Sequence, residues 1–507
     1  MDRQLSIPGL PHALARDGWW LDEGAAPPAQ GDGGSGPAGV RFPRRLAAVL
    51  TLVALADFLF WGRAPGLSVV IFAAAILAWG LQGAGAWRRP AGLFLVAALP
   101  AVDHLQPLSL AFLLVGLGGA LTWAHHPAAP IAALSSATGA FLGRLPVAWL
   151  AQLDPRRLFA LPAALAEAPV PLVRKVLRDW ALPLGGALVL VALLMQANPV
   201  LAQLVQIDLD LWQLAQRLVF WGGIAVLVGP FLAPVPPCDR VTRGLVIPSI
   251  APGWLNPGSV LRGLAVFNLL IAVQSLTDVS ILLGGADLPE GMTLAEYAHR
   301  GAYPLLAAAV LAGAFALAAR PFLGEHRLIR PLLLLWLMQN MVLCGAAALR
   351  LDLYIETFGL TYLRLHALIW MALVAAGMGL ALWQVLRARS NRWLLVRGGV
   401  LGLATLYLCA MVNFAQVIAA QNVTRAEPDL RYLCGLGPMA AGPIVESGLG
   451  RVIGRSVQLG PCWITRPEVE DWRGWGFRSW RASRYVQGVM VERPDEDPDR
   501  GRRSPPT

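Results

Sequence analysis

Two aspartates lie inside long apolar stretches of this chain, where a charged side chain is costly. Asp57 occurs in ALADFLFWGRAPG and Asp278 in QSLTDVSILLGG. A charge at mid-depth in a bilayer costs about 2.5 to 3.5 kcal/mol on insertion scales, so such residues usually bind a ligand, carry a proton or pair with an opposite charge. Both aspartates are therefore candidates for a ligand or proton site.

Other polar residues lie near the ends of neighbouring apolar stretches and extend this candidate site. Its further members are Glu296, Tyr297, His299, Arg300, Arg350 and Asp352. Uncharged polar residues lie in the stretch around Asp278 and in two later stretches: Asn268, Gln274, Ser275, Thr277, Gln339, Asn340, Asn413 and Gln416. The Asp, Glu, His and Arg members of the set lie toward the outer side, which predicts an outward-facing polar cavity for a small solute, an ion or a lipid headgroup, with proton coupling through Asp278 as one mechanism.

A structural interpretation stands beside this one. Either aspartate could pair with an arginine at the end of a stretch and fix the packing of two helices, because buried opposite charges need each other. The arginines available for such pairs are Arg63, Arg300, Arg350 and Arg364.

Metal and enzyme chemistry find little support in the residue pattern. Glu296 and His299 could share a helix face at i, i+3, yet the chain has no HExxH, CxxC or nucleophile-elbow motif. The only lysine, Lys175, precedes Val176, which excludes a Walker A phosphate loop. We therefore assign no metal, no cofactor and no catalytic residue, and we do not expect transport driven by nucleotide hydrolysis.

These residues are positioned by apolar stretches that fill residues 46 to 420. With a rise of about 1.5 Å per residue, most are long enough to cross or nearly cross a hydrocarbon core of about 30 Å. They are Leu, Ala, Val and Gly runs without period-2 alternation, so they are expected to be helices. The eleven predicted spans are 46–62, 67–84, 91–102, 107–124, 181–196, 218–234, 263–284, 301–319, 331–349, 365–386 and 398–420.

The composition agrees with an all-α, polytopic transmembrane helix bundle. The chain has 507 residues, of which 56% are hydrophobic and only 14% charged, against about 25% charged in an ordinary soluble domain. Its net charge is +10, and its positive residues are almost all Arg, many of them in loops between spans. Such loop charge sets orientation and is not typical of a nucleic-acid surface, so nucleic acid is not an expected partner.

The distribution of Arg orients the bundle with its amino terminus in the cytoplasm. Loops on that side then carry most of the Lys and Arg, as the positive-inside rule requires. An odd number of spans places the carboxyl end outside, in the extracytoplasmic space. Because span 91–102 is short, ten or twelve spans are alternatives to eleven.

The remaining segments follow from this topology. We expect residues 1–45 to be a disordered cytoplasmic tail, residues 125–180 an interfacial cytoplasmic segment within the 46–420 bundle, and residues 491–507 a disordered tail. Residues 421–490 would form a small extracytoplasmic region. It contains Cys434 and Cys462, which could form a disulfide in an oxidising compartment that closes a loop of about 28 residues and contributes about 3 kcal/mol; two free buried thiols are the alternative.

The carboxy-terminal region also contains DWRGWGFRSWRASRY, residues 471–485, in which Trp and Arg alternate. Next to a membrane, such a segment is expected to lie on anionic headgroups or to pack on the outer loops. The lipid bilayer is thus one expected partner, and an envelope protein is another.

Several motifs together resemble a known family. ALADFLFWGRAPGLS, residues 276–306 and 348–371, NFAQVIAAQNVTR, LRYLCGLGP and DWRGWGF are similar to bacterial polytopic membrane proteins classed as domain of unknown function 4173, related to the 4153 group. The resemblance covers roughly residues 46 to 485 and implies a multi-pass protein of the bacterial inner (plasma) membrane. It implies no catalytic residue. That family usually has an Asp-Ala pair after LGP, where this chain has Met439 and Ala440.

Two functions follow as hypotheses. In the first, the polar cavity binds or moves a small solute, an ion or a lipid headgroup. In the second, the protein is a non-catalytic envelope scaffold or signalling accessory that acts through its carboxy-terminal region and its cytoplasmic loop. A third, membrane-embedded transfer onto lipid-linked substrates, is less favoured, because no paired carboxylates beyond the set above support it.

Overall fold

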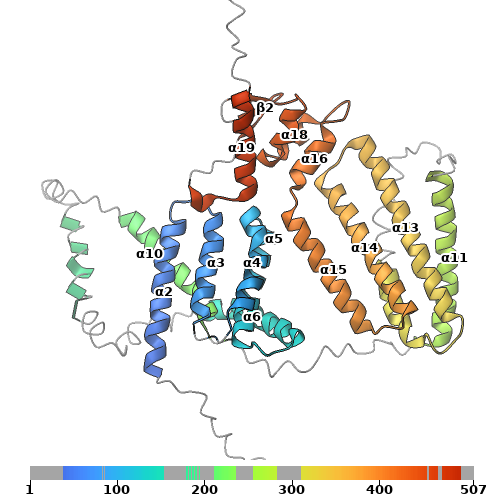
Figure 1. The fold of residues 1–507 in the computed structure, drawn as a ribbon, viewed down its shortest axis with the longest axis horizontal. Helices are drawn as coiled ribbons and strands as arrows, with labels where there is room; N and C mark the ends of the chain where they lie inside the picture. Colours follow the sequence, from blue (N-terminus) through green and yellow to red (C-terminus); the bar gives the residue numbers. More distant parts are fainter. Residues whose placement is uncertain are drawn as a thin grey trace, which may run out of the picture. The chain divides into compact units, whose positions relative to one another are not determined.

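A computed structural model describes residues 38–82, 84, 86–152, short pieces of 179–194, 211–233, 235, 255–282, 310–453, 456–465 and 471–492. These residues form helices, except for a small sheet near the carboxyl end (Figure 1). The predictions for residues 1–37, for most of span 181–196 and for Glu296, Tyr297, His299 and Arg300 lie outside the described residues, as does the tail after residue 492.

Within the described residues, seven helices are long and apolar enough to cross a membrane. They are Pro107–His125, Ile131–Gln152, Trp212–Leu232, Pro257–Asp278, Ile329–Phe358, Tyr362–Leu386 and Asn391–Met411. The chain is therefore a multi-pass, helical membrane protein. The total of eleven spans stays a prediction.

The chain divides into two compact units. The first contains Met1–Ala54 and Ala148–Leu232. It includes most of α2 (Ala38–Phe60), all of α10 (Leu211–Val228) and the short helix η1 (Gly229–Leu232). In this unit the indole Nε1 of Trp149 donates to the carbonyl of Leu227 at 3.1 Å. The second unit, Leu55–Val147 and Ala233–Thr507, holds every described candidate residue.

One group of helices in the second unit comprises α3 (Leu67–Gly80), α4 (Arg88–Asp103), α5 (Pro107–His125) and most of α6 (Ile131–Gln152). Helices α4 and α5 pack closely, since a Cβ on Gly116 would lie 2.2 Å from the Cβ of Ala97. Only glycine allows this approach.

Two predicted boundaries in this group differ from the structure. Helix α3 has 14 residues and α4 has 16, so they rise only about 21 and 24 Å, less than the core of a bilayer. Helix α6 is one continuous apolar helix of 22 residues within the segment that is expected to lie at the cytoplasmic interface, and that location stays a prediction. Pro146 lies within α6 and does not end the helix.

The second group comprises α11 (Pro257–Leu282), the helix Val310–Phe322, α13 (Ile329–Phe358), α14 (Tyr362–Leu386) and α15 (Asn391–Met411). Ser390 begins α15 by accepting from the backbone N–H of Trp393 at 3.2 Å, which satisfies a free donor at the helix start. Gly359 ends α13 with φ +80°, a conformation that favours glycine.

The predicted span 398–420 is two helices. Helix α15 ends at Met411, and α16 (Phe414–Asn422) begins directly after it. The side chain of Asn413 accepts from the backbone N–H of Gln416 at 3.3 Å and caps the new helix. An asparagine favours this start because its side chain replaces the missing helical hydrogen bond.

The carboxy-terminal region is built from short elements: α16, α17 (Leu430–Gly435), η4 (Pro438–Ala440), α18 (Ala441–Glu446), β1 (Arg451–Ile453), β2 (Ser456–Leu459), β3 (Cys462–Thr465), η5 (Trp472–Gly474) and α19 (Phe477–Glu492). The strands form an antiparallel sheet in the order β1-β2-β3. Gly460, with φ +56°, lies in the turn between β2 and β3.

One hydrophobic core joins this region to the ends of α13 and α14. Ile418, Leu433 and Ile444 are fully buried, and the same cluster includes Ile355 of α13 and Met371 of α14. The region therefore does not stand alone as a small domain. Its stability depends on the membrane helices against which it packs.

Candidate functional site

The interface between α11 and α13 changes from apolar to polar along its length. The two helices lie side by side (Figure 1). They run in the same direction, because Asn268 contacts Leu332 and, further along both helices, Asp278 contacts Arg350. Near their beginnings the contact is apolar and buried; its residues include Val260, Leu264, Ile329 and Leu333.

Further along, polar side chains replace the apolar ones, and we call this part the polar seam. It consists of Asn268, Ser275 and Asp278 on α11 and Gln339, Asn340 and Arg350 on α13. On each helix, most of these polar residues follow a buried apolar residue, or one another, at a spacing of three, four or seven positions. They therefore lie on the same helix face as the apolar contacts.

The seam contains a fully buried ion pair. Asp278 is 0% exposed and Arg350 is 3% exposed. The Oδ1 atom of Asp278 accepts from Nη2 of Arg350 and, at 2.8 Å, from Nε2 of Gln274. Desolvation makes such a pair costly to form, and removing one partner leaves a buried charge that costs about 3 to 5 kcal/mol.

The two asparagines of the seam have defined orientations. Nδ2 of Asn268 donates to the carbonyls of Leu264 at 2.7 Å and Leu332 at 3.1 Å. Nδ2 of Asn340 donates to the carbonyl of Trp336 at 2.7 Å. A carbonyl only accepts, so the amide nitrogen must face it and the amide oxygen must face the other way.

Buried oxygen atoms therefore remain without a donor along the seam. Among the described residues, Oδ1 of Asn268, Oδ1 of Asn340, Oε1 of Gln339 and Oγ of Ser275 have no hydrogen-bond partner. Asn268 and Asn340 are 5% and 0% exposed. A buried acceptor without a donor costs about 1 to 3 kcal/mol, so four of them are unexpected in an interface that serves packing alone.

The ion pair lies nearer to one end of the bundle. Arg350 precedes the end of α13 at Phe358 by eight residues, or about 12 Å of helix. At this end Asn422 of the carboxy-terminal region donates to the carbonyl of Leu360 at 2.8 Å and accepts from its N–H at 2.7 Å. The ion pair thus lies in the half of α13 that adjoins the carboxy-terminal region, whereas Gln339 and Asn340 lie in its first half.

The structure does not bring Asp57 to this site. Asp57 lies on α2, whereas Asp278 lies on α11, which packs on α13. Several helices separate the α3 group from α13. Successive contacts lead from α3 to α5, α4, α15, α14 and finally α13. Asp352 is on α13 but exposed. Of the predicted site residues that the structure describes, only Asp278 and Arg350 meet.

A second ion pair, largely shielded from solvent, joins the carboxy-terminal region to the helices. The sequence pattern did not predict it. Arg478 of α19 donates to Oδ2 of Asp103, at the end of α4, through Nε at 3.0 Å and also through Nη2. The same Nη2 donates to the carbonyl of Ala410 at 3.3 Å, and Gln106 donates to that carbonyl at 3.1 Å. We call this contact the α4–α19 joint.

The neighbouring segment 471–476 packs on the loop between α2 and α3. The backbone N–H of Leu67 donates to the carbonyl of Trp475 at 2.7 Å. Gly66 and Gly474 approach so closely that a Cβ on Gly66 would lie 2.4 Å from the backbone of Gly474. Arg63 lies 3.7 Å from Asp471. Of the two expectations for this Trp/Arg segment, the structure shows packing on the loops.

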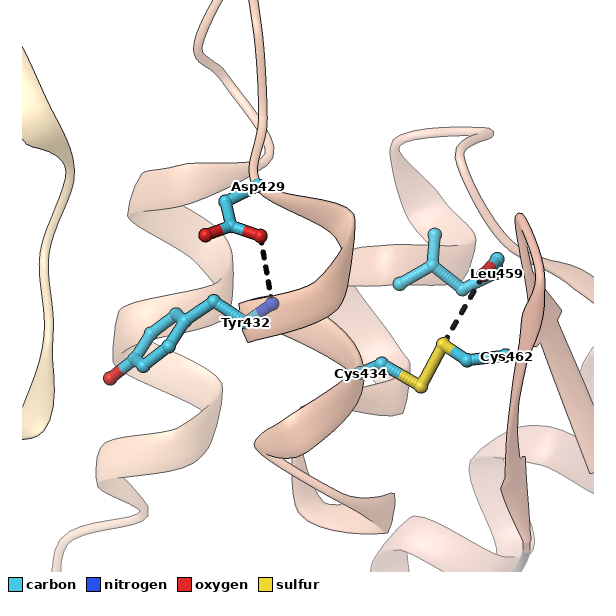
Figure 2. Close-up of a disulfide and its surroundings, with 5 residues drawn as sticks. All are labelled: Asp429, Tyr432, Cys434, Leu459 and Cys462. Atoms are coloured by element: carbon cyan, nitrogen blue, oxygen red, sulfur yellow. Dashed lines mark hydrogen bonds between the residues drawn. A yellow bond between two sulfur atoms is a disulfide. The ribbon is translucent and has the colours of Figure 1, made fainter.

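The disulfide candidates are bonded to each other. Cys434 of α17 and Cys462 of β3 form a disulfide with Cα atoms 6.5 Å apart, as Figure 2 shows. Asp429 caps α17 beside it by accepting from the N–H of Tyr432 at 2.9 Å. The bridge links the helical part of the carboxy-terminal region to its sheet.

No group of three or more His, Cys, Asp and Glu side chains in the described part of the chain could hold a metal ion.

Fold and site together define a class: a multi-pass α-helical membrane protein with a buried polar interface between two spans. Residues 46–447 match the family described as Domain of unknown function (DUF4153), and the chain belongs to this family. The sequence resemblance named the 4173 group and gave the 4153 group as related. The family that matches is the 4153 group. Neither curated proteins nor solved structures gave a match.

Proposed function

We propose that this protein binds or moves a small polar solute or ion at the polar seam between α11 and α13. The observation that carries the proposal is the fully buried Asp278–Arg350 pair among buried oxygens that accept no hydrogen bond from described residues. In a membrane protein, buried ionisable residues of this kind are typical of substrate and ion pathways. Protonation of Asp278 would release Arg350, which offers one way to couple binding to a proton.

We further propose that the Asp278–Arg350 end of the seam lies toward the extracytoplasmic side of a bacterial inner membrane. The Cys434–Cys462 disulfide supports an oxidising compartment for the carboxy-terminal region. Arginines at the opposite ends of the helices support a cytoplasmic location there. These are Arg88, Arg89, Arg320, Arg327, Arg330, Arg387, Arg389 and Arg392.

The test is the substitution Asp278→Asn in a strain that requires this protein. We expect at least a tenfold loss of function, because the amide cannot neutralise Arg350 or exchange a proton. Immunoblotting of membranes verifies that the variant is inserted. Asp352→Asn is the matched control, since Asp352 is exposed on the same helix. Full function and an unchanged pH response of the Asp278 variant would remove the proposal.

A scaffold acting through the carboxy-terminal region is the second candidate. The observation in its favour is a set of large apolar side chains exposed on that region, Trp463, Trp472, Phe477 and Trp480. On this view the partner is an envelope protein or the bilayer surface. Deletion of residues 421–507 would then abolish function, while Asp278→Asn would leave it intact.

A further inference from the structure

We infer that the polar seam binds a small monovalent cation through side-chain oxygens. This inference rests on the proposed function and names the class of ligand. The oxygens are Oγ of Ser275, Oε1 of Gln339 and Oδ1 of Asn340, with Oδ1 of Asn268 further from the ion pair.

The first step is that three of these oxygens lie at a similar height. Asn268 contacts Leu332, and α11 and α13 run in the same direction. Seven residues make about two helical turns, so Ser275 and Gln339 are level with each other, two turns beyond that contact. Asn340 follows Gln339 directly. Asp278 lies about one turn further along α11.

The second step is the chemistry of the atoms that face the seam. The two asparagines have their nitrogens engaged by backbone carbonyls, so they present oxygen. Nε1 of Trp336 is a buried donor beside them that lacks a hydrogen-bond partner among described residues. A site rich in carbonyl and hydroxyl oxygens favours a cation or a donor of hydrogen bonds, and it disfavours an anion.

The third step is the charge of the surroundings. Arg350 already neutralises Asp278, so no uncompensated carboxylate faces the oxygens of Ser275, Gln339 and Asn340. Ca²⁺ and Mg²⁺ usually require carboxylate ligands, and their desolvation in a membrane would be far more costly. A monovalent cation suits a neutral set of oxygen dipoles, as in transporters that bind Na⁺ near mid-membrane. Na⁺, K⁺ and NH₄⁺ share this chemistry.

The experiment measures thermal unfolding of the full chain in nanodiscs of phosphatidylethanolamine and phosphatidylglycerol. NaCl, KCl and NH₄Cl are each compared with choline chloride at equal ionic strength. We expect at least one of the three cations to raise the unfolding midpoint by about 3 °C, because a ligand that binds only the folded state stabilises it. Equilibrium binding of radioactive sodium to the same nanodiscs provides a second readout.

The variants Asn340→Leu and Gln339→Leu test which side chains bind the cation. Each should abolish the dependence on the cation while the midpoint in choline stays equal or rises, since an apolar side chain removes an unsatisfied acceptor. Asn391→Leu is the matched control. Asn391 accepts from Gln384 at 2.8 Å between α14 and α15, so its loss should lower the midpoint equally in every salt and keep the cation effect.

Equal midpoints in all four salts, with no bound sodium, would overturn the cation inference. They would leave the proposed function standing if Asp278→Asn still abolishes function in cells. A cation effect that persists in both leucine variants would also overturn the assignment. A cation effect lost in both, in a protein whose Asp278→Asn variant is fully functional, would support the site and contradict the proposed function.

Discussion

Two Asp–Arg pairs in the described part of the chain have nearly the same chemistry but different surroundings. At the α4–α19 joint, Arg478 is 7% exposed and donates both to Asp103 and to the carbonyl of Ala410. Gln106 also donates to that carbonyl. Along the polar seam, Asp278 and Arg350 are buried more deeply, at 0% and 3% exposed, yet neighbouring amide and hydroxyl oxygens accept no bond from described residues.

This difference separates a structural pair from a candidate site. An ion pair whose polar neighbours are all bonded stabilises a contact and leaves nothing for a ligand. An ion pair beside unsatisfied oxygens carries a free-energy cost that a ligand or water could remove. Burial alone does not distinguish the two; the state of the neighbouring groups does.

The largest expected effect concerns the α4–α19 joint. Arg478→Ala would leave Asp103 buried without its partner and should lower the free energy of unfolding by about 3 to 5 kcal/mol. Limited proteolysis in nanodiscs should then cut within residues 471–492. Arg481→Ala is the control, because Arg481 is exposed and should change stability by less than about 0.5 kcal/mol. Equal effects of both variants would mean that the joint contributes little.

The disulfide should contribute somewhat less. Replacing both cysteines, Cys434→Ser and Cys462→Ser, frees a loop whose ends are 28 residues apart, and we expect a loss of about 3 kcal/mol. Denaturant unfolding of the carboxy-terminal region, followed by its tryptophan fluorescence, measures this loss. The intact protein should also lose the same stability on reduction. A variant as stable as the unreduced protein would contradict this expectation.

A smaller effect on stability distinguishes the seam from the joint. The double substitution Asp278→Leu with Arg350→Leu removes both charges, so the free energy of unfolding should change by no more than about 1 kcal/mol. Function in cells should nevertheless be lost. Thermal unfolding in nanodiscs and growth of the dependent strain measure the two outcomes. A double variant that functions normally would show that the seam, like the joint, serves packing.

The smallest effect is a pH dependence at the joint. Burial lowers the pKa of His104, the charge of Arg478 lowers it further, and Asp103 opposes both. The folded state therefore favours the neutral imidazole. Its contribution is complete above the unfolded pKa of about 6.5 and is lost as the pH falls through that value toward the lowered folded pKa.

His104→Gln should remove this dependence. The measurement is the unfolding midpoint of both proteins between neutral pH and about pH 5. The parent midpoint should fall more steeply with acid than that of the variant. Parallel curves would mean that His104 titrates alike in the folded and unfolded states.

Several features of the fold could be predicted from sequence because they depend on local composition. Residues 331–349 and 365–386 are predominantly apolar, and both lie within helices of the structure, Ile329–Phe358 and Tyr362–Leu386. The break at Asn413 and the continuity of α6 through Pro146 were not predicted. Asn413 supplies a local capping signal inside a stretch that is otherwise apolar. A proline costs a helix interior only about 3 kcal/mol, which packing can offset.

The sequence by itself determined that this chain is a helical membrane protein, because long apolar runs can satisfy their backbone in a bilayer only as helices. It also identified Asp278, Arg350 and the uncharged polar residues of the seam as unusual in their surroundings. Only the tertiary structure decided which charges meet. Asp278 pairs with Arg350 across 72 residues and Asp103 with Arg478 across 375, and no local pattern can select among distant arginines, because the partner is set by how the helices pack.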